Sequence, residues 1–453
     1  MGYWTERGFC RAASVDMSVA GESTDYLSYE SRLQAMLMVE AALASALARS
    51  GIISDDQAIT IAKACRVDSY NAEALERLGA KAGTPVIPLV EELVAKVHSI
   101  SESTSRFVHY GATSQDILDT ATILQLKNVV PQISEYLSRI EAEFFSRAKE
   151  NANTPVLGRT LLQAGPPISF GLKLAGWAAA VRRARLRLEE GARESLCLQF
   201  GGAVGNLSSL GSAGKDVAQH LANVLDLPLP QAPWHTHRDA LVNLASYAAI
   251  LVGSLGKLAR DISLHAQEEI AEVREPSVSG KGGSSSMPHK RNPVGCMRIL
   301  AAANRSPALA SSLLSAMPQE HERGLGGWQS EWPSLRDLFS LALDASAEMA
   351  EMAEGLEVDS DRMRANLEAT NEVVFSERLS ISLMTHLGRI EAQERVADLV
   401  KQSIEQNRKL SLVVAEDTEV QSVLDSKALD SVFNVFDALG SSSVFIDRLL
   451  EAE

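Results

Sequence analysis

The sequence predicts an all-α protein organised around unusually long helices. Three segments carry apolar residues at the spacing of three and four that marks one face of a helix, and all are much longer than an average helix: 116–150, 164–193 and 238–272. Strand-like patterns are sparse, and 196–200 is the best candidate for a short ribbon. We therefore expect helices to supply almost all of the core.

The remaining elements are predicted from their start and stop signals. Gly51 ends a first amphipathic helix, and Ser54 is placed to cap the next one. Pro131 falls inside the first long helix and predicts a kink there. Two more long helices are expected at 294–317 and 331–352. This order suggests three helical domains, which we place at 1–112, 113–355 and 356–453.

The segment 238–272 has no proline and is apolar or small on nearly every side. A helix that is apolar all round is expected to be buried on all sides. One chain offers too few long helices to surround it. We therefore expect other copies of the chain to complete a central bundle, as a homo-oligomer.

Composition excludes several classes of partner. The net charge of −15 over 453 residues argues against a nucleic-acid-binding surface. The four cysteines are far apart without a C-x-x-C pair, which suits a reducing cytoplasm and predicts no disulfide framework. His235 and His237 lack further ligands at metal-binding spacing, so no metal site is expected. We expect a cytoplasmic protein without nucleic-acid or membrane partners.

The segment 276–288 stands apart, because eight of its thirteen residues are Gly or Ser. An ordinary flexible linker is one interpretation. However, the run ends in Lys290 and Asn292 immediately before an apolar helix, which favours a mobile loop that closes over an anion. A Walker phosphate loop is excluded, since Lys281 is followed by Gly282 rather than Ser or Thr.

Two other segments could contribute to a site. Thr113 and Ser114 open the first long helix, where free N–H groups bind carboxylates, although capping alone would also explain them. His109 lies just before them and is either a packed histidine or a catalytic one. The stretch 158–167 indicates by itself only a turn and a helix start.

Taken together, these three segments resemble the fumarase/aspartase superfamily. Its signature Gly-Ser-Ser-x-Met-Pro-x-Lys-x-Asn is matched without a gap by Gly283 to Asn292. Within the superfamily the chain looks most like the bacterial cycloisomerase family that lactonises 3-carboxy-cis,cis-muconate. That closer likeness rests on the segments 200–203, 233–236, 280–283 and 317–323, the last of which is followed by Trp328, Glu331 and Trp332.

The resemblance implies a three-domain all-α fold with a central long-helix bundle shared by four subunits, whose sites combine segments of different subunits. It implies intramolecular lactonisation of 3-carboxy-cis,cis-muconate, or a related 3-substituted muconate, through an enediolate intermediate, in aromatic (protocatechuate, β-ketoadipate) catabolism. No cofactor is implied, and the partner is a small polycarboxylate. The catalytic residues would be Ser284, Lys290 and His109. Substrate binding would fall to Thr113, Ser114, Thr160, Gln163, Ser285, Met287, Asn292, His321 and Arg323.

Three departures from superfamily patterns separate the alternatives. Adenylosuccinate lyases carry a His where this chain has Leu161 and a Glu where it has Met297, which argues against a standard amine lyase. Some cycloisomerases carry a His at the position of Ala164, so the second proton-transfer group stays open. A C–N lyase that eliminates fumarate from a substituted aspartate or succinate, and an inactive structural homologue, remain the alternative hypotheses.

Overall fold

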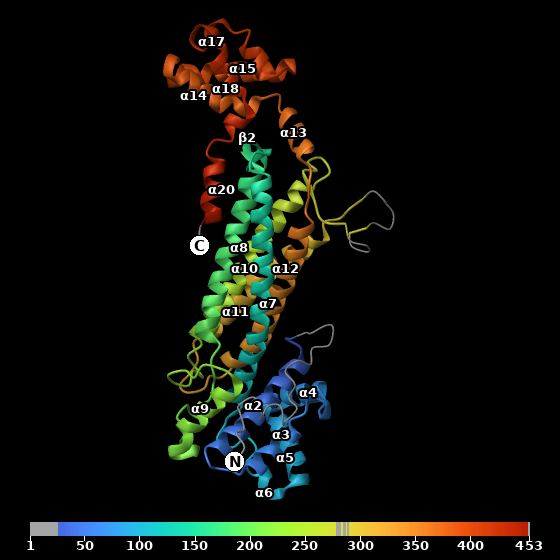
Figure 1. Cartoon of the computed structure of the whole chain (residues 1–453), viewed down its shortest axis with the longest axis vertical. Helices are drawn as coiled ribbons and strands as arrows, with labels where there is room; N and C mark the ends of the chain where they lie inside the picture. Colours follow the sequence, from blue (N-terminus) through green and yellow to red (C-terminus); the bar gives the residue numbers. More distant parts are fainter. Residues whose placement is uncertain (1–25, 278–281, 284–286, 288–289, 452–453) are drawn as a thin grey trace, which may run out of the picture. The chain divides into compact units, whose positions relative to one another are not determined.

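Helices dominate the structure of this chain (Figure 1). The computed structural model describes residues 26–277, 282–283, 287 and 290–451. The chain divides into two compact units. Unit 1 takes its described residues from Met1–Glu135, Leu186–Val252 and Asn304–Asp344, and unit 2 takes them from Tyr136–Arg185, Gly253–Ala303 and Ala345–Glu453. The predicted domain borders near 112 and 355 stay a prediction.

Five long helices contribute segments to both units, and within each unit these segments pack together. They are α7 (Ser114–Glu150), α8 (Phe170–Ser195), α10 (Asp239–His265), α11 (Val294–Ala316) and α12 (Gly327–Gly355). The predicted helices at 116–150, 294–317 and 331–352 are therefore confirmed. Pro131 lies inside α7.

Unit 1 adds a set of shorter helices, several of which begin at a side-chain cap. They are α2 (Tyr29–Arg49), α3 (Asp55–Ala64), η1 (Val67–Ser69), α4 (Ala72–Ala82), α5 (Val86–Ile100), α6 (Glu102–Ser105), η2 (Ser208–Ala213) and α9 (Gly214–Leu225). Ser54 caps α3 as predicted, and Gln57 returns a side-chain bond to the N–H of Ser54. The resulting capping box fixes where α3 begins.

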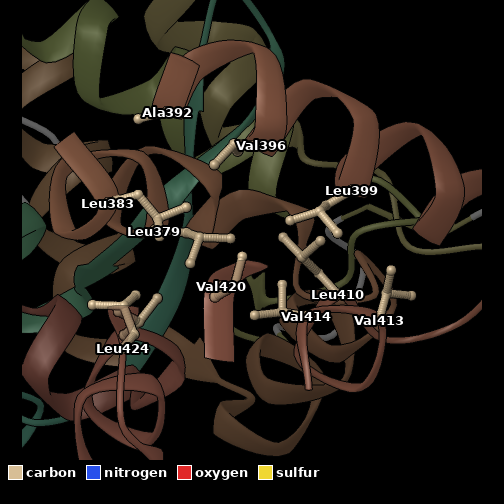
Figure 2. Packing of buried hydrophobic residues seen from close by; sticks show 11 residues of the cluster. Leu379, Leu383, Ala392, Val396, Leu399, Leu410, Val413, Val414, Val420 and Leu424 are labelled. Atoms are coloured by element: carbon tan, nitrogen blue, oxygen red, sulfur yellow. The ribbon is translucent and has the colours of Figure 1, made fainter. Parts of the chain in front are cut away.

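Unit 2 holds the short strands and the C-terminal helices. Its strands are β1 (Pro155–Thr160), β2 (Gln163–Ser169), β3 (Val273–Arg274) and β4 (Glu357–Val358). Its helices from residue 360 on are α13 (Ser360–Glu368), η3 (Val373–Phe375), α14 (Ser376–Leu387), α15 (Arg389–Gln406), α16 (Leu410–Val414), α17 (Thr418–Val423), α18 (Ser426–Phe433), α19 (Val435–Ala438) and α20 (Ser442–Glu451). Leu379, Leu383, Leu410 and Val414 belong to the buried apolar cluster that joins several of these helices (Figure 2).

The prediction of a helix beginning at residue 164 is wrong. Residues 163–169 form β2, which pairs antiparallel with β1, and α8 begins only at Phe170. Pro166 and Pro167 would fit the first turn of a helix, where the N–H groups have no partner, and a two-stranded sheet also tolerates proline at an outer edge. The prolines are therefore compatible with either element, and the strand follows from the pairing of β2 with β1.

The predicted ribbon at 196–200 is also wrong, because this segment is irregular. Its backbone groups make individual hydrogen bonds instead of pairing with another strand. The N–H of Gln199 donates to Oγ1 of Thr120 at 3.1 Å, and the Thr120 hydroxyl donates to the carbonyl of Gln199 at 2.8 Å. The N–H of Leu198 donates to the carbonyl of Pro228. Side-chain and loop partners thus replace a strand ladder here.

Helix α10 is shorter than expected, and within one chain it is not fully enclosed. It ends at His265 rather than Glu272, and the chain then turns through Ala271, which has a left-handed φ of 50°. By length and composition α10 could span a membrane, but 56% of its apolar window is buried. Ile250, Gly253 and Lys257 leave one exposed stripe, so the helix is not buried on all sides within one chain.

Candidate active site

Arg323 and the start of α7 come together in unit 1. The guanidinium of Arg323 donates to Oγ1 of Thr113, and its Nε donates to Oε1 of Gln115 at 3.3 Å. Both partners are neutral, and no carboxylate among the described residues lies within ion-pair distance of Arg323. Burial lowers the pKa of Arg323 despite the charges of Asp116 and Asp119. A half-buried cation beside a helix start is a suitable place for an anion.

A buried ionic network holds this arrangement in place. Arg238 donates to Asp119 at 2.7 Å and to Glu331 at 3.0 Å, and all three side chains are buried. Trp328 also donates to Asp119, at 2.9 Å. Because Gln115 donates to the same carboxylate at 3.2 Å, the amide that contacts Arg323 is itself fixed. Burial raises the pKa of Glu331, partly offset by Arg238.

Asp116 ties the beginning of α7 to a distant loop. Its carboxylate accepts hydrogen bonds from the N–H groups of Gly201 at 2.9 Å and Gly202 at 2.8 Å, and from the N–H of Thr113 at 3.1 Å. Its Oδ1 also lies 2.7 Å from Nε2 of His235. His235 is buried in this contact, whereas His237 is exposed.

His109 lies in the turn before α7 and pairs with helix α2. Its Nδ1 is 2.6 Å from Oε1 of Glu40. Burial alone would lower the pKa of His109, but the Glu40 carboxylate outweighs burial, and with a contribution from Asp116 the pKa is raised. The structure therefore supplies a partner that favours the protonated imidazole.

His321 belongs to the same unit but is held mainly by its backbone. Its side chain is exposed, its φ is 50°, and its carbonyl accepts a hydrogen bond from the hydroxyl of Thr236 at 2.9 Å. Ser114, the first residue of α7, is half-buried. Of the predicted site residues, unit 1 thus holds His109, Thr113, Ser114, His321 and Arg323.

Thr160 and Gln163 lie in unit 2, at the tip of the β1–β2 hairpin. They face each other as the last paired residues, and both are exposed. Leu161 and Leu162 form the two-residue turn between them, with φ of 50° and 66°. These leucines are 96% and 72% exposed. A left-handed conformation costs a leucine about 1 kcal/mol, so this turn combines strain with exposed apolar surface.

Two backbone hydrogen bonds in unit 2 hold the end of the signature segment. The N–H of Asn292 donates to the carbonyl of Gly282 at 2.9 Å, and the N–H of Lys290 donates to the carbonyl of Met287 at 3.0 Å. Lys290 and Met287 are exposed, and Asn292 is half-buried. Ser284 and Ser285 lie outside the described residues. The structure therefore places the end of the predicted loop but not its serines.

Glu275 fixes the helix that follows this segment. Its carboxylate accepts hydrogen bonds from the N–H groups of Gly295 at 2.9 Å and Cys296 at 2.7 Å, in the first turn of α11. A carboxylate at a helix start satisfies free donors and complements the helix dipole. The position of Asn292 is thereby coupled to a rigid helix.

Sequence reasoning missed the residues that support the site rather than line it. Glu40, Asp119, Arg238 and Glu331 are charged residues within apolar helical patterns, and all are buried. A buried charge almost always has a partner, so charged residues on the apolar face of a helix were the available signal. Their partners, however, are separated by tens to hundreds of residues and could not be matched from one sequence.

Comparison with known proteins places the chain in a family. Residues 14–305 match the lyase family, and residues 372–449 match the adenylosuccinate lyase C-terminus. The chain is 42% identical over 422 residues to a 3-carboxy-cis,cis-muconate cycloisomerase of Bradyrhizobium diazoefficiens, covering 93% of this chain and 94% of the relative. A protein of the same name from Pseudomonas aeruginosa is 44% identical, with 92% of this chain and 91% of the relative covered.

A solved structure agrees with these relatives. The crystal structure of 3-carboxy-cis,cis-muconate lactonizing enzyme from Pseudomonas putida matches with a TM-score of 0.87 and 42% identity, over 93% of this chain and 94% of the other. The fold and the sequence similarity therefore extend over the same, nearly complete length. The chain belongs to the lyase family, within the fumarase/aspartase superfamily, and it is similar there to proteins named 3-carboxy-cis,cis-muconate cycloisomerase.

Proposed function

We propose that this protein is a cycloisomerase that lactonises 3-carboxy-cis,cis-muconate, or a closely related 3-substituted muconate. The observation that carries the proposal is the similarity, at 42–44% identity over more than nine-tenths of the chain, to enzymes of that name. Arg323 adds a structural argument. The half-buried guanidinium of Arg323 donates its hydrogen bonds to neutral Thr113 and Gln115, and no ion pair with a described residue neutralises it, so it can accept a substrate carboxylate.

The reaction requires positioning, neutralisation and one proton. A carboxylate oxygen of the substrate attacks the β carbon of its own double bond, forming the C–O bond of the lactone. The electron pair of the alkene moves onto another carboxyl group, which becomes an enediolate. A proton then adds to the α carbon, so each turnover takes one proton from solvent. Because the nucleophile is internal, proximity supplies much of the acceleration.

We assign the stabilisation or protonation of the enediolate to Lys290, with Ser284 in the same proton-transfer unit and His109 as the third catalytic group. An enediolate carries more charge than the substrate carboxylate, so a cation at that position lowers the barrier to reaction. The substrate would be bound by the remaining predicted residues: Thr113, Ser114, Thr160, Gln163, Ser285, Met287, Asn292, His321 and Arg323.

We further propose that the protein acts in the cytoplasm as a homotetramer whose sites combine segments of different subunits. Helix α11 supports this assembly. Arg298 and Arg305 are its only charged residues, and Met297 and Leu314 are 60% and 53% exposed. A long helix with few charges and exposed apolar side chains is typical of a surface that another subunit covers.

An ultraviolet assay tests the function directly. Purified protein is offered 3-carboxy-cis,cis-muconate, adenylosuccinate and argininosuccinate in parallel. Loss of the diene absorbance of the muconate, with formation of the lactone, is the expected result. Fumarate release from either amino-succinate would instead support the C–N lyase, and no turnover of any substrate would support an inactive homologue.

The C–N lyase is kept as a second candidate because residues 372–449 match the adenylosuccinate lyase C-terminus. Against it stand Leu161 and Met297, which occupy the positions of the His and Glu expected in adenylosuccinate lyases. Leu161 has no titratable group and is fully exposed at the hairpin tip. Met297→Glu alone should therefore create no adenylosuccinate lyase activity.

A further inference from the structure

Glu40 is a buried carboxylate within an apolar stretch of helix α2. Its flanking residues Val39 and Ala41 are buried, and Glu40 itself is 1% exposed. Oε1 lies 2.6 Å from Nδ1 of His109, whereas Oε2 has no hydrogen-bond partner within the described ranges of the chain. Burying a carboxylate with a single partner is costly, and a neutral side chain would pack there at lower free energy.

The other buried carboxylates of unit 1 are much better satisfied. Asp116 accepts hydrogen bonds from three backbone N–H groups and from Gln199, and it contacts His235. Asp119 accepts from Arg238, Trp328 and Gln115. Such saturation is expected of carboxylates that hold a fold together. Glu40 differs from them because it serves one side chain only.

The imidazole of His109 is fixed through Nδ1, and its Nε2 is available for another partner. The backbone of His109 has a left-handed φ of 58°, and Gly111 has φ of 80° where a Cβ would meet the side chain of Leu210 at 2.6 Å. The turn is therefore tightly constrained. Nδ1 is taken by Glu40, whereas Nε2 bonds to no described residue, and the side chain of His109 remains 19% exposed.

Cys65 and Tyr70 near Glu40 are neutral, and one further carboxylate acts on His109. Burial first, then the charge of Glu40, raises the pKa of Cys65. Burial also raises the pKa of Tyr70, with smaller contributions from Cys65, Glu92 and Glu40, so both groups remain neutral. Asp116 is the second carboxylate that acts on His109. Glu40 is thus the charged group in contact with His109, and Asp116 reinforces it from a greater distance.

We propose that Glu40 is a positioning residue: it orients the ring of His109 through Nδ1 and keeps it protonated, so that Nε2–H is the proton donor of the lactonisation and Lys290 stabilises the enediolate. This inference rests on the proposed function. The proton passes from Nε2 to the α carbon of the enediolate, whose electron pair forms the new C–H bond. The imidazole is left neutral and takes its next proton from solvent, which matches the net uptake of one proton.

Residue-by-residue exchange of histidine C2–H, followed by mass spectrometry, tests the pairing without substrate. In Glu40→Gln the midpoint of the His109 exchange curve should fall by about one pH unit or more. Glu40→Asp, which keeps the charge, should retain part of the raised midpoint. Glu272→Gln is the matched control, because it removes the carboxylate of the equivalent 2.6 Å pair with His265, and it should leave the His109 midpoint unchanged.

Kinetics then separate positioning from simple packing. Glu40→Gln should lower kcat at least about tenfold with little change in KM, and the loss of kcat with rising pH should begin at a lower pH, following the His109 midpoint. Partial recovery in Glu40→Asp should accompany its recovered midpoint. An unchanged midpoint, or an unchanged pH profile, in Glu40→Gln would overturn the proposal.

The two proposals fail in different ways. A wild-type protein that does not turn over muconates, but whose His109 midpoint falls in Glu40→Gln, rejects the lactonisation and with it the donor role, while the pairing stands. An active wild-type protein whose midpoint does not fall rejects the positioning role of Glu40 alone. If Glu40→Gln does not fold, Glu40→Asp and His109→Gln decide: a kcat in His109→Gln within about threefold of wild type overturns the proposal.

Discussion

At the scale of single residues, Lys290 is an exposed lysine whose only described hydrogen bond is made by its backbone. Since its ammonium supports nothing in the described fold, Lys290→Met should leave the melting temperature and the oligomer unchanged. Turnover should fall by about two to three decades, because a charge contact to the enediolate worth about 3–4 kcal/mol is removed. Steady-state kinetics with 3-carboxy-cis,cis-muconate provide the measurement.

Lys427→Met is the control for Lys290→Met, since Lys427 is an exposed lysine of the same unit outside the proposed site. It should keep wild-type kinetics. If Lys290→Met retains more than about a tenth of wild-type turnover, a loss of two decades is excluded and the assignment of Lys290 is wrong. The cationic role would then pass to His109 or Arg323.

Arg323 offers a second residue-scale prediction. Arg323→Met should reduce kcat/KM by about ten- to a hundredfold, mainly through KM, because a charge-assisted hydrogen bond to a carboxylate contributes about 1.5–3 kcal/mol. Arg323→Lys should recover part of the loss. Arg66→Met, which removes an exposed arginine paired with Asp68, serves as control. A KM within twofold of wild type in Arg323→Met would exclude a carboxylate contact.

At the scale of elements, the β1–β2 hairpin has a turn that local preferences disfavour. Asn-Gly is the pair best suited to two left-handed turn residues. The double variant Leu161→Asn/Leu162→Gly should therefore raise the free energy of unfolding, measured at low protein concentration, by about 1–2 kcal/mol. Urea unfolding monitored by circular dichroism measures the gain. Leu412→Asn, at an exposed leucine of α16, should give none. Equal unfolding midpoints for the turn variant and wild type would refute the strain.

Glu272 links the hairpin to the turn after α10 and to α13. Burial alone would raise its pKa, but hydrogen bonds from His265, Arg159 and Asn366 outweigh burial and lower that pKa to about 2. A carboxylate with a lowered folded pKa stabilises the protein above its unfolded pKa, and this contribution is lost as pH falls toward 2. Allowing for solvent screening, Glu272 should account for about 1 kcal/mol lost between pH 6 and pH 3.5.

Comparing urea midpoints at these two pH values in wild type and Glu272→Gln measures that contribution. The variant should be less stable near neutral pH and should lose less stability on acidification. An identical pH dependence in the two proteins would show that Glu272 does not titrate in this range.

The elements that could be predicted from the sequence are those governed by local rules. Helical periodicity located α7, α11 and α12, and capping located the start of α3. The β1–β2 hairpin was missed because leucines occupy its turn and prolines its second strand, against the usual preferences. For the candidate site, the contact of Arg323 with Thr113 depends on residues 210 apart, a pairing that no local pattern encodes.

At the scale of the whole molecule, the exposed stripe of α10 and the exposed face of α11, which has few charges, predict association. We expect light scattering at micromolar concentration to give about four times the chain mass of 48.8 kDa. Leu314→Glu and Ala308→Glu, which place charges on the exposed face of α11, should produce smaller and less active species. A fully active monomer would contradict the prediction of a tetramer and the proposal that its sites combine segments of different subunits.

The network around Asp116 also has a consequence for biosynthesis. The start of α7 bonds to Gly201 and Gly202, 85 and 86 residues later, and the cation beside Thr113 is Arg323, 210 residues later. A growing chain on the ribosome can form α7 as a helix early, since helix formation is local. The anion site proposed at this end, however, stays incomplete until more than two-thirds of the protein has been translated, so a shorter nascent chain should not capture polycarboxylates there.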